Sequence, residues 1–123
     1  MIEIKKVTDP IVIAQIYETH QISKEEKDHV IATIENGEIL HCAVFSYENE
    51  TGKIKAISGF NEDLLLLAGL CRAILNILDI NGVKEVYLPI RYEKLANFVG
   101  FKKTEEEYLL HLEGFFKCGC CNH

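Results

Sequence analysis

The sequence lacks an excess of positive charge. Lysine and arginine together number 13 against 19 aspartates and glutamates, which gives a formal net charge of -6. A protein that binds nucleic acid neutralises phosphates with clustered lysine and arginine, and such clusters are missing here. We therefore expect no nucleic-acid partner, and no attraction to anionic membranes for the same reason.

The sequence also lacks a segment that suits export or membrane insertion. The first ten residues, MIEIKKVTDP, contain no apolar signal-peptide core, so we expect a cytoplasmic protein. The longest apolar run, Leu64 to Ile80, carries Arg72, Asn76 and Asp79, and its length is marginal for a hydrocarbon core of about 30 Å. We expect it to be a largely buried helix with one polar stripe rather than a membrane span.

Proline is scarce, glycine is of average abundance, and no segment is repetitive. Two prolines and eight glycines among 123 residues, with 48% hydrophobic and 26% charged residues, are typical of a globular chain. A chain of this length buries one core, so we expect one domain. The five cysteines are an odd number, which argues against a disulfide framework and leaves free thiols or metal ligands as the alternatives.

Turn and cap signals divide the N-terminal half into strands and helices. Residues 2–7, IEIKKV, predict a strand, and Asp9 before a proline predicts a helix over Pro10–Glu18. Ser23 and Glu26 have the spacing of a capping box and predict a second, short helix.

A three-stranded antiparallel meander is predicted next. Asn36-Gly37 is a strong hairpin signal, and the polar turn Glu48–Gly52 leads into the strand KIKAIS. Both faces of the strand from Ile39 to Tyr47 are apolar, so it should be central in the sheet. Alternation predicts two sets of side chains on opposite faces: Leu40, Cys42 and Val44 on one, and Ile39, Ala43 and Phe45 on the other.

The C-terminal half reads as helix, strand, helix and strand. The predicted segments are the helix Leu64–Ile80 with its stop at Asn81-Gly82, the strand KEVYLPI, a helix over Arg91–Val99 ending at Gly100, and the strand EEYLLHLEGFF.

This order, together with IENGEILHCAVFSY, AGLCRAIL and LANFVGF, resembles the GCN5-related N-acetyltransferases (GNAT), the acyl-CoA N-acyltransferase fold. The resemblance implies an α/β fold over residues 1–116, a mixed, mostly antiparallel twisted sheet with helices on both faces. Residues 117–123 are then a separate, cysteine-rich tail. It implies that acetyl-CoA lies between the fourth and fifth strands, with its pantetheine along the backbone of Ala56, Ile57 and Ser58.

The family's pyrophosphate loop reads Arg or Gln, two residues, Gly, one residue, then Gly or Ala. If Ile74 and Leu75 match the paired leucines that follow this motif in the family, Gly69 matches the first glycine. Cys71 then stands at the second small residue, and Leu66 replaces the Arg or Gln. The resemblance then implies that the amides of Leu67, Ala68, Gly69, Leu70 and Cys71 cradle the phosphates. In the alternative, the helix begins near Asp63, capped by Asn61, and there is no phosphate loop.

The family's second signature is incomplete. Gly100-Phe101 is present, but Ala96 stands where the family has the tyrosine that protonates the departing thiolate, and Pro89 stands roughly where it has an asparagine. Tyr92, one helical turn earlier, is the substitute candidate for the acid, and a half-buried structural tyrosine is the alternative.

Two carboxylates are candidates for the general base. Glu62 and Asp63 follow the fourth strand, and their alternative role is to cap the amides at a helix start. His41 and Cys42 are adjacent on a strand and therefore point to opposite faces, which excludes a nucleophile and base pair. His20 has no partner that the sequence reveals.

The tail KCGCCNH is the feature that the resemblance leaves unexplained. Cys118 and Cys121 have C-x-x-C spacing, with Cys120 between them and His123 at the end, which predicts half of a site for zinc or another soft metal. The alternative is a tail of reduced thiols.

The leading functional hypothesis is an acetyl-CoA-dependent N-acetyltransferase with a degenerate phosphate loop, acting on a small-molecule or peptide amine. The competing hypothesis is a non-catalytic GNAT-fold module that uses its cleft, or the CGCCNH tail, for binding a ligand, a metal or a partner. Exposed sheet edges also make a homodimer plausible.

Overall fold

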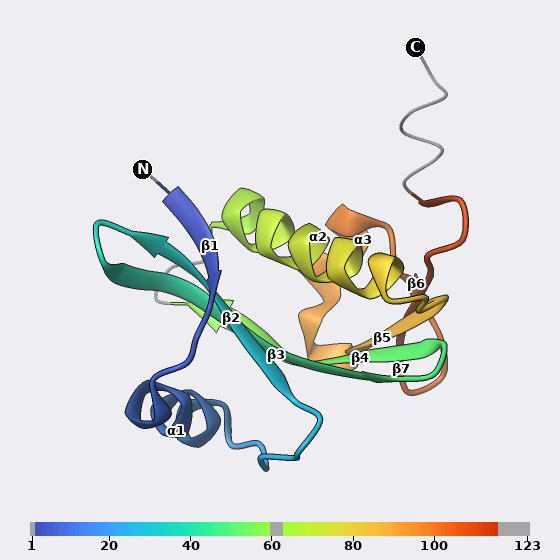
Figure 1. The fold of residues 1–123 in the computed structure, drawn as a ribbon. Coiled ribbons are helices and arrows are strands. Elements are labelled where there is room, and N and C mark those ends of the chain that lie inside the picture. The colour runs from blue at the N-terminus through green and yellow to red at the C-terminus, as the bar shows by residue number, and fades with distance from the viewer. Residues whose placement is uncertain (1, 60–62, 116–123) are drawn as a thin grey trace.

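The computed structural model describes residues 2–59 and 63–115, which form one mixed sheet with helices on both faces (Figure 1). The seven strands lie in the order β1-β2-β3-β4-β5-β7-β6, and only β4 and β5 are parallel. This confirms the predicted α/β class and mostly antiparallel sheet. The elements are β1 (Ile2–Lys6), α1 (Pro10–His20), β2 (His29–Glu35), β3 (Glu38–Glu48), β4 (Thr51–Gly59), α2 (Leu64–Ile80), β5 (Glu85–Pro89), a 3-10 turn (Ile90–Tyr92), α3 (Glu93–Val99), β6 (Lys102–Lys103) and β7 (Glu107–His111).

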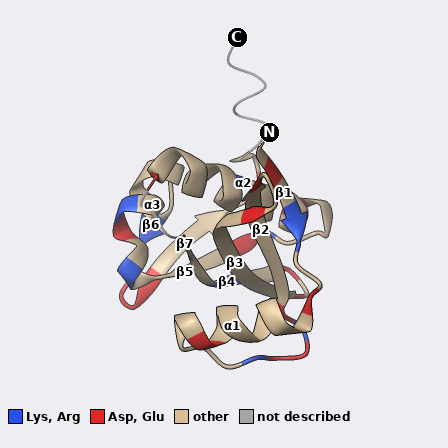
Figure 2. Ribbon diagram, turned by 90° about the vertical axis from the view of Figure 1, so that its left-hand side faces the viewer, with Lys and Arg blue, Asp and Glu red and all other residues tan. Residues whose placement is uncertain are grey.

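The sheet separates two hydrophobic cores. Figure 2 shows α1 on one side of the sheet and α2 with α3 on the other. The larger core packs α2 and α3 against β3, β4, β5 and β7, and includes the fully buried Leu70, Ile74 and Leu88. The smaller core packs Ile16 and Tyr17 of α1 against β2 and β3. The two faces of the sheet can therefore carry separate binding sites.

Several sequence predictions are confirmed residue by residue. Asn36 and Gly37 have φ values of 53° and 81°, as a tight hairpin turn requires. The long helix runs from Leu64 to Ile80, and Gly100 ends α3 with φ 115°. The structure adds β6, a strand of two residues that the sequence does not reveal.

The predicted alternation along β3 is wrong at its start. Thr33 pairs with His41 but Ile34 pairs with Ile39, so Leu40 is an extra, bulged residue. Because one extra residue reverses the faces, Ile39 packs in the α1 core together with Cys42 rather than opposite it.

The predicted helix at Ser23 is also wrong, because the carbonyl of the predicted N-cap accepts a hydrogen bond from a distant lysine instead of from a helical amide. Lys55 Nζ donates to the Ser23 carbonyl at 2.8 Å, to Glu25 Oε1 at 2.9 Å and to Asp28 Oδ2 at 2.9 Å. Asp28 Oδ2 also accepts from Tyr17 Oη and from the Glu25 amide. The segment therefore wraps around the Lys55 ammonium instead of forming a helical turn.

Lys55 occupies a bulge in β4. Val44 pairs with Ala56 and Phe45 pairs with Ile54, which leaves Lys55 without a partner residue on β3. Its side chain is 11% exposed, and that of Asp28 is 1% exposed. A bulge bends its strand and increases the twist, and here the lysine that creates the bulge is also the cation that holds the segment after α1.

We predict that Lys55→Met lowers the free energy of unfolding by about 3 kcal/mol, because it leaves the buried Asp28 carboxylate without its cation. Urea denaturation measures this. Lys27→Met is the matched control, because Lys27 pairs with Glu48 on the exposed surface, and it should change stability by about 0.5 kcal/mol or less. Equal changes in the free energy of unfolding for the two substitutions would show that the buried pair stabilises the fold no more than the exposed pair.

The same pair should make stability depend on acidity. Burial alone raises the pKa of Asp28, but the hydrogen bonds from Lys55 and Tyr17 outweigh it and leave this pKa below its usual value. The carboxylate therefore stabilises the fold above about pH 4, and this stabilisation is lost as the pH falls through the lowered pKa. We predict that Asp28→Asn is less stable than wild type at about pH 7 and that the gap narrows toward about pH 2. A gap that stays constant in urea denaturation over this range would contradict the assignment.

Candidate functional site

The sheet opens between its two parallel strands. Three residue pairs join β4 to β5, and the last of them is Lys53 with Tyr87. Beyond this point β4 passes through the Lys55 bulge and continues to Gly59, while β5 ends at Pro89. Beyond Lys53 the edge of β4 on the β5 side therefore has no paired strand, and we call this divergence of the two strands the opening of the sheet.

Tyr92 lies against this edge. Its Oη accepts a hydrogen bond from the Ile57 amide at 3.1 Å and another from Arg91 Nη2 at 3.2 Å. The Arg91 guanidinium lies 4.8 Å from the centroid of the Tyr92 ring. Two donors on the oxygen leave the phenol hydrogen itself as the group that Tyr92 can offer to a third partner. The structure thus brings together two predicted site residues, Tyr92 and Ile57.

The three predicted pantetheine-contacting residues alternate across β4. Ala56 and Ile57 are buried, and Ile57 packs in the α2 core. Ser58 pairs with Cys42 and is half-buried on the α1 face. A ligand in the opening would therefore meet main-chain groups at Ile57, whereas the Ser58 hydroxyl faces the other side of the sheet.

The start of α2 agrees with the second of the two alternatives drawn from the sequence. Asp63 is the N-cap, and its Oδ1 accepts from the amides of Leu65 at 3.1 Å and Leu66 at 3.2 Å. The Leu67 amide donates to the Asp63 carbonyl at 3.0 Å. The predicted capping role of Asp63 is thus confirmed, while its role as a base stays a prediction. The other proposed cap, Asn61, and the second candidate base, Glu62, lie outside the described residues.

The residues predicted to cradle phosphate lie inside this helix. Leu67, Ala68, Gly69, Leu70 and Cys71 follow the N-cap by at least one turn, where each amide is bonded to a carbonyl four residues earlier. Ala68, Leu70 and Cys71 are buried, and burial raises the pKa of the Cys71 thiol to about 12. Gly69 is exposed, and a Cβ added there would meet no atom within 4 Å. The expected cradle of amides therefore disagrees with the observed helix, because these donors are already used.

Acetyl-CoA consequently fits one half of the site and not the other. At β4 a pantetheine arm would reach the Ile57 amide only by displacing the Tyr92 hydroxyl, which now accepts its hydrogen bond. The first turn of α2 does not offer a pyrophosphate site, because a carboxylate already occupies its amides and would repel a second anion. Four leucines, Leu64 to Leu67, also fill this turn, where close approach to phosphate calls for small residues.

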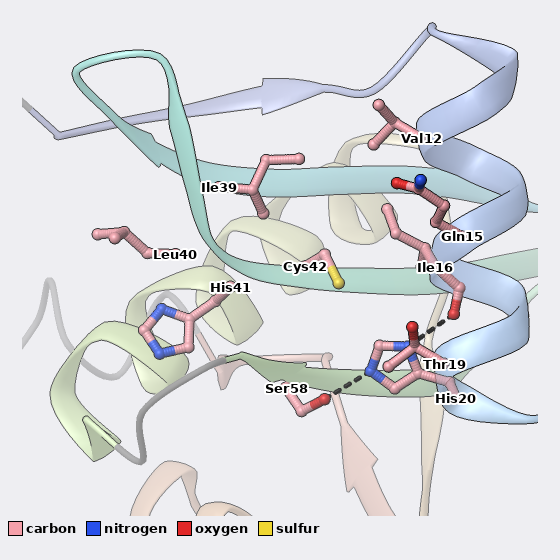
Figure 3. Close-up of a pocket in the computed structure, with 10 residues that line it drawn as sticks. All are labelled: Val12, Gln15, Ile16, Thr19, His20, Ile39, Leu40, His41, Cys42 and Ser58. Carbon is pink, nitrogen blue, oxygen red and sulfur yellow. Dashed lines mark hydrogen bonds between the residues drawn. The ribbon is translucent and has the colours of Figure 1, made fainter.

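A cavity of about 250 Å³ lies on the other face, between α1 and the strands β3 and β4. At its inner end His20 Nε2 lies 2.5 Å from Ser58 Oγ, and His20 Nδ1 lies 2.9 Å from the Ile16 carbonyl oxygen (Figure 3). Sequence reasoning missed this pair, because 38 residues separate its members and no local spacing links the end of a helix to the end of a strand.

His41 and Cys42 point to different sides of β3, as strand alternation predicts (Figure 3). Cys42 packs in the α1 core, and burial raises the pKa of its thiol to about 11. The thiol is therefore protonated at neutral pH and behaves as a small hydrophobic side chain.

The predicted metal ligands Cys118, Cys120, Cys121 and His123 lie outside the described residues. Within residues 2–59 and 63–115, no group of three or more histidines, cysteines or carboxylates is placed to hold a metal ion. Over the same ranges, no helix is long and apolar enough to cross a membrane.

We predict that Asp63→Ala lowers the free energy of unfolding by about 1 kcal/mol, because two amides of the first turn of α2 lose their acceptor. Asp63→Asn should retain most of the stability, since its side-chain oxygen can still cap. Thermal or urea unfolding distinguishes them. If both substitutions are neutral, the carboxylate does not anchor the start of α2.

Comparisons with known proteins agree with this architecture. No family model and no curated protein matches the sequence. Among solved structures, an N-acetyltransferase from Staphylococcus aureus is 18% identical, with a TM-score of 0.71 over 92% of this chain and 99% of the other. The ribosomal-protein-S18-alanine N-acetyltransferase of Escherichia coli is 14% identical, with a TM-score of 0.70 over 89% and 90%.

A third similar structure has acetyl-CoA bound. It is a GNAT-family acetyltransferase from Elizabethkingia anophelis with acetyl-CoA bound, 19% identical, with a TM-score of 0.62 over 85% of this chain and 78% of the other. At these identities the likeness is one of fold. The described chain, with its seven-stranded sheet opened between β4 and β5, has the fold of the GNAT superfamily of acetyltransferases.

Proposed function

We propose that this protein is an acyl-CoA-dependent N-acyltransferase, with acetyl-CoA as the donor and a small-molecule or peptide amine as the acceptor. The observation that carries the proposal is the open edge of β4, where the Ile57 amide meets the Tyr92 hydroxyl instead of another strand. The similar Elizabethkingia protein has acetyl-CoA bound, and the similar E. coli enzyme is an alanine N-acetyltransferase, which supports this class of reaction.

Acetyl-CoA would supply an activated acyl group, and the overall reaction replaces its carbon–sulfur bond by a carbon–nitrogen bond and releases a thiol. The chain's own contribution begins with position. The backbone of Ala56 to Ser58 would hold the donor along β4, and the Ile57 N–H is the donor best placed to polarise an acyl oxygen there. Tyr92 Oη holds the proton that a departing sulfur needs, which is the role given to it from the sequence.

Binding by this site would depend little on the nucleotide end of the donor. Asp63 already takes the Leu65 and Leu66 amides, and the predicted phosphate contacts from Leu67 to Cys71 lie within α2. We therefore expect the pantetheine arm along β4 to provide most of the affinity.

A non-catalytic GNAT-fold binding module is the second candidate. It is favoured by the same Asp63 cap and by Ala96, which replaces the usual acid of the family and is fully buried in this chain. The soft-metal site at the C-terminal tail, the homodimer and the cytoplasmic location stay predictions.

Backbone NMR tests the proposal. We predict that acetyl-CoA and S-acetylpantetheine, added separately to the reduced full chain, both shift the amide resonances of Ile57 and Ser58. Their affinities should agree within about tenfold, because the nucleotide end gains no contact at α2. The amides of Leu65 and Leu66 should stay unshifted with either compound.

Two outcomes would count against it. If neither compound shifts β4 at millimolar concentration, the opening does not bind an acyl thioester and the non-catalytic alternative gains support. If acetyl-CoA alone binds and shifts Leu65 and Leu66, the phosphates displace Asp63 and the α2 terminus is the anchor after all. Tyr92→Phe is the matched variant, which should bind as well as wild type and transfer the acyl group at least about tenfold more slowly.

A further inference from the structure

The cavity beneath α1 has mostly apolar walls and a polar end at His20 and Ser58. Its walls come mainly from Val12 and Ile16 of α1 and from Ile39, Leu40 and Cys42 of β3, and the polar residues Gln15, Thr19 and His41 also line it. Figure 3 shows the Ile39 and Cys42 side chains directed toward α1 and the His20 ring between the helix and Ser58. Its volume of about 250 Å³ is below the range of about 300–1,000 Å³ of pockets for drug-sized ligands. The site is therefore suited to a small, mostly apolar molecule.

The hydrogen bonds at the polar end fix the tautomer of a neutral His20 ring. A carbonyl oxygen can only accept, so the contact of His20 Nδ1 with the Ile16 oxygen requires hydrogen on Nδ1. In the neutral ring Nε2 then carries a lone pair, and the 2.5 Å contact is a hydrogen bond that Ser58 donates to Nε2. The hydroxyl hydrogen of Ser58 is thus used in the hydrogen bond to His20 Nε2.

The hydrogen bond from Ser58 to His20 determines which kind of ligand the cavity can recognise. With its hydrogen used, Ser58 Oγ offers only lone pairs to a molecule in the cavity. A ligand that meets it must donate a hydrogen bond, and its remaining surface must be apolar to match the walls. A primary amine with a short apolar substituent meets both conditions, whereas a carboxylate or ketone of the same shape brings a second acceptor to Ser58.

The polar end lies one residue along β4 from the proposed donor site. Ser58 follows Ile57, whose amide donates to Tyr92 Oη. His20 is the last residue of α1, so the end of this helix places its ring beside Ser58.

We propose that the cavity binds the acceptor, a small primary amine with an apolar substituent, and that Ser58 and His20 accept its proton. This rests on the proposed function. As the nitrogen lone pair forms the carbon–nitrogen bond and the carbon–sulfur bond breaks, the N–H that donates to Ser58 Oγ loses its proton to that oxygen, and the Ser58 proton moves to His20 Nε2. The nitrogen keeps the electron pair of the N–H bond as its new lone pair, the leaving sulfur takes a proton from Tyr92 Oη, and the imidazolium later returns its proton to solvent. Ser58 contacts the substrate, and His20 acts through Ser58.

Ligand binding by the full chain tests this inference without acyl transfer. The probes are 2-phenylethylamine, which donates, and 4-phenylbutan-2-one, which only accepts. In two-dimensional NMR the amine should shift the resonances of the His20 ring and of Ile39 and Cys42. The dissociation constant obtained from these shifts should be at least about tenfold lower for the amine than for the ketone.

Variants separate recognition from packing. Ser58→Ala should abolish the preference for the amine, and His20→Phe should shift it toward the ketone, because the Ser58 hydrogen becomes free to donate. Cys42→Phe should fill the cavity and remove binding of both probes. His111→Phe, an exposed histidine on β7, is the control and should leave binding unchanged.

The outcomes distinguish this inference from the proposed function. Amine binding at the cavity without any thioester response at Ile57 would support the site and contradict the acyltransferase proposal. A thioester response at Ile57 with no amine effect on His20 would overturn the inference alone. Equal affinities for amine and ketone in wild type and in Ser58→Ala would also overturn it, and Ser58→Ala gives this answer even if His20→Phe does not fold.

Discussion

The ion pair between Lys55 and Asp28 determines much of the geometry around both candidate sites. Lys55 is the extra residue of the β4 bulge, and its ammonium also holds the segment between α1 and β2. A buried ammonium is stable only with partners, so the bulge and the wrapped segment depend on each other. The bulge lies where β4 leaves β5, and Asp28 also binds Tyr17 on α1, the helix that carries His20. The Lys55–Asp28 ion pair thus contacts the strand that borders the opening of the sheet and, through Tyr17, the helix that borders the cavity.

A competition for amides distinguishes the two ends of the cleft. At β4 the Ile57 amide is bonded to a neutral hydroxyl, which a ligand can displace at modest cost. At α2 the Leu65 and Leu66 amides are bonded to the carboxylate of Asp63, which also gains from the helix dipole. A pyrophosphate would have to displace that carboxylate. A pantetheine arm should therefore bind along β4 more easily than a pyrophosphate binds at the start of α2.

Local signals predicted most of the fold, because they act between residues close in sequence. The Asn36-Gly37 turn, the boundaries of α2 and the Gly100 stop follow from backbone preferences at single positions. The failures come from contacts over longer distances. The capping box at Ser23 was overridden by Lys55, and the bulge at Leu40 changed the faces of β3 without any glycine or proline to signal it.

The candidate site was predictable only in part for the same reason. The resemblance indicated β4 and Tyr92, and the structure brings Tyr92 to Ile57. It could not separate a phosphate loop from a capped helix, because Asp63 serves as a cap only once the start of α2 is known. The His20–Ser58 pair depends on how the end of α1 lies over β4, which no pattern within either segment encodes.

A crystal structure of the full chain with acetyl-CoA would show which half of the cleft holds the donor. We expect the pantetheine arm along β4, hydrogen-bonded near Ile57, with Asp63 still bonded to the Leu65 and Leu66 amides and the pyrophosphate away from α2. Acetyl-CoA with its pyrophosphate on the first turn of α2 and Asp63 displaced, or no acetyl-CoA between β4 and β5 at saturating concentration, would contradict it.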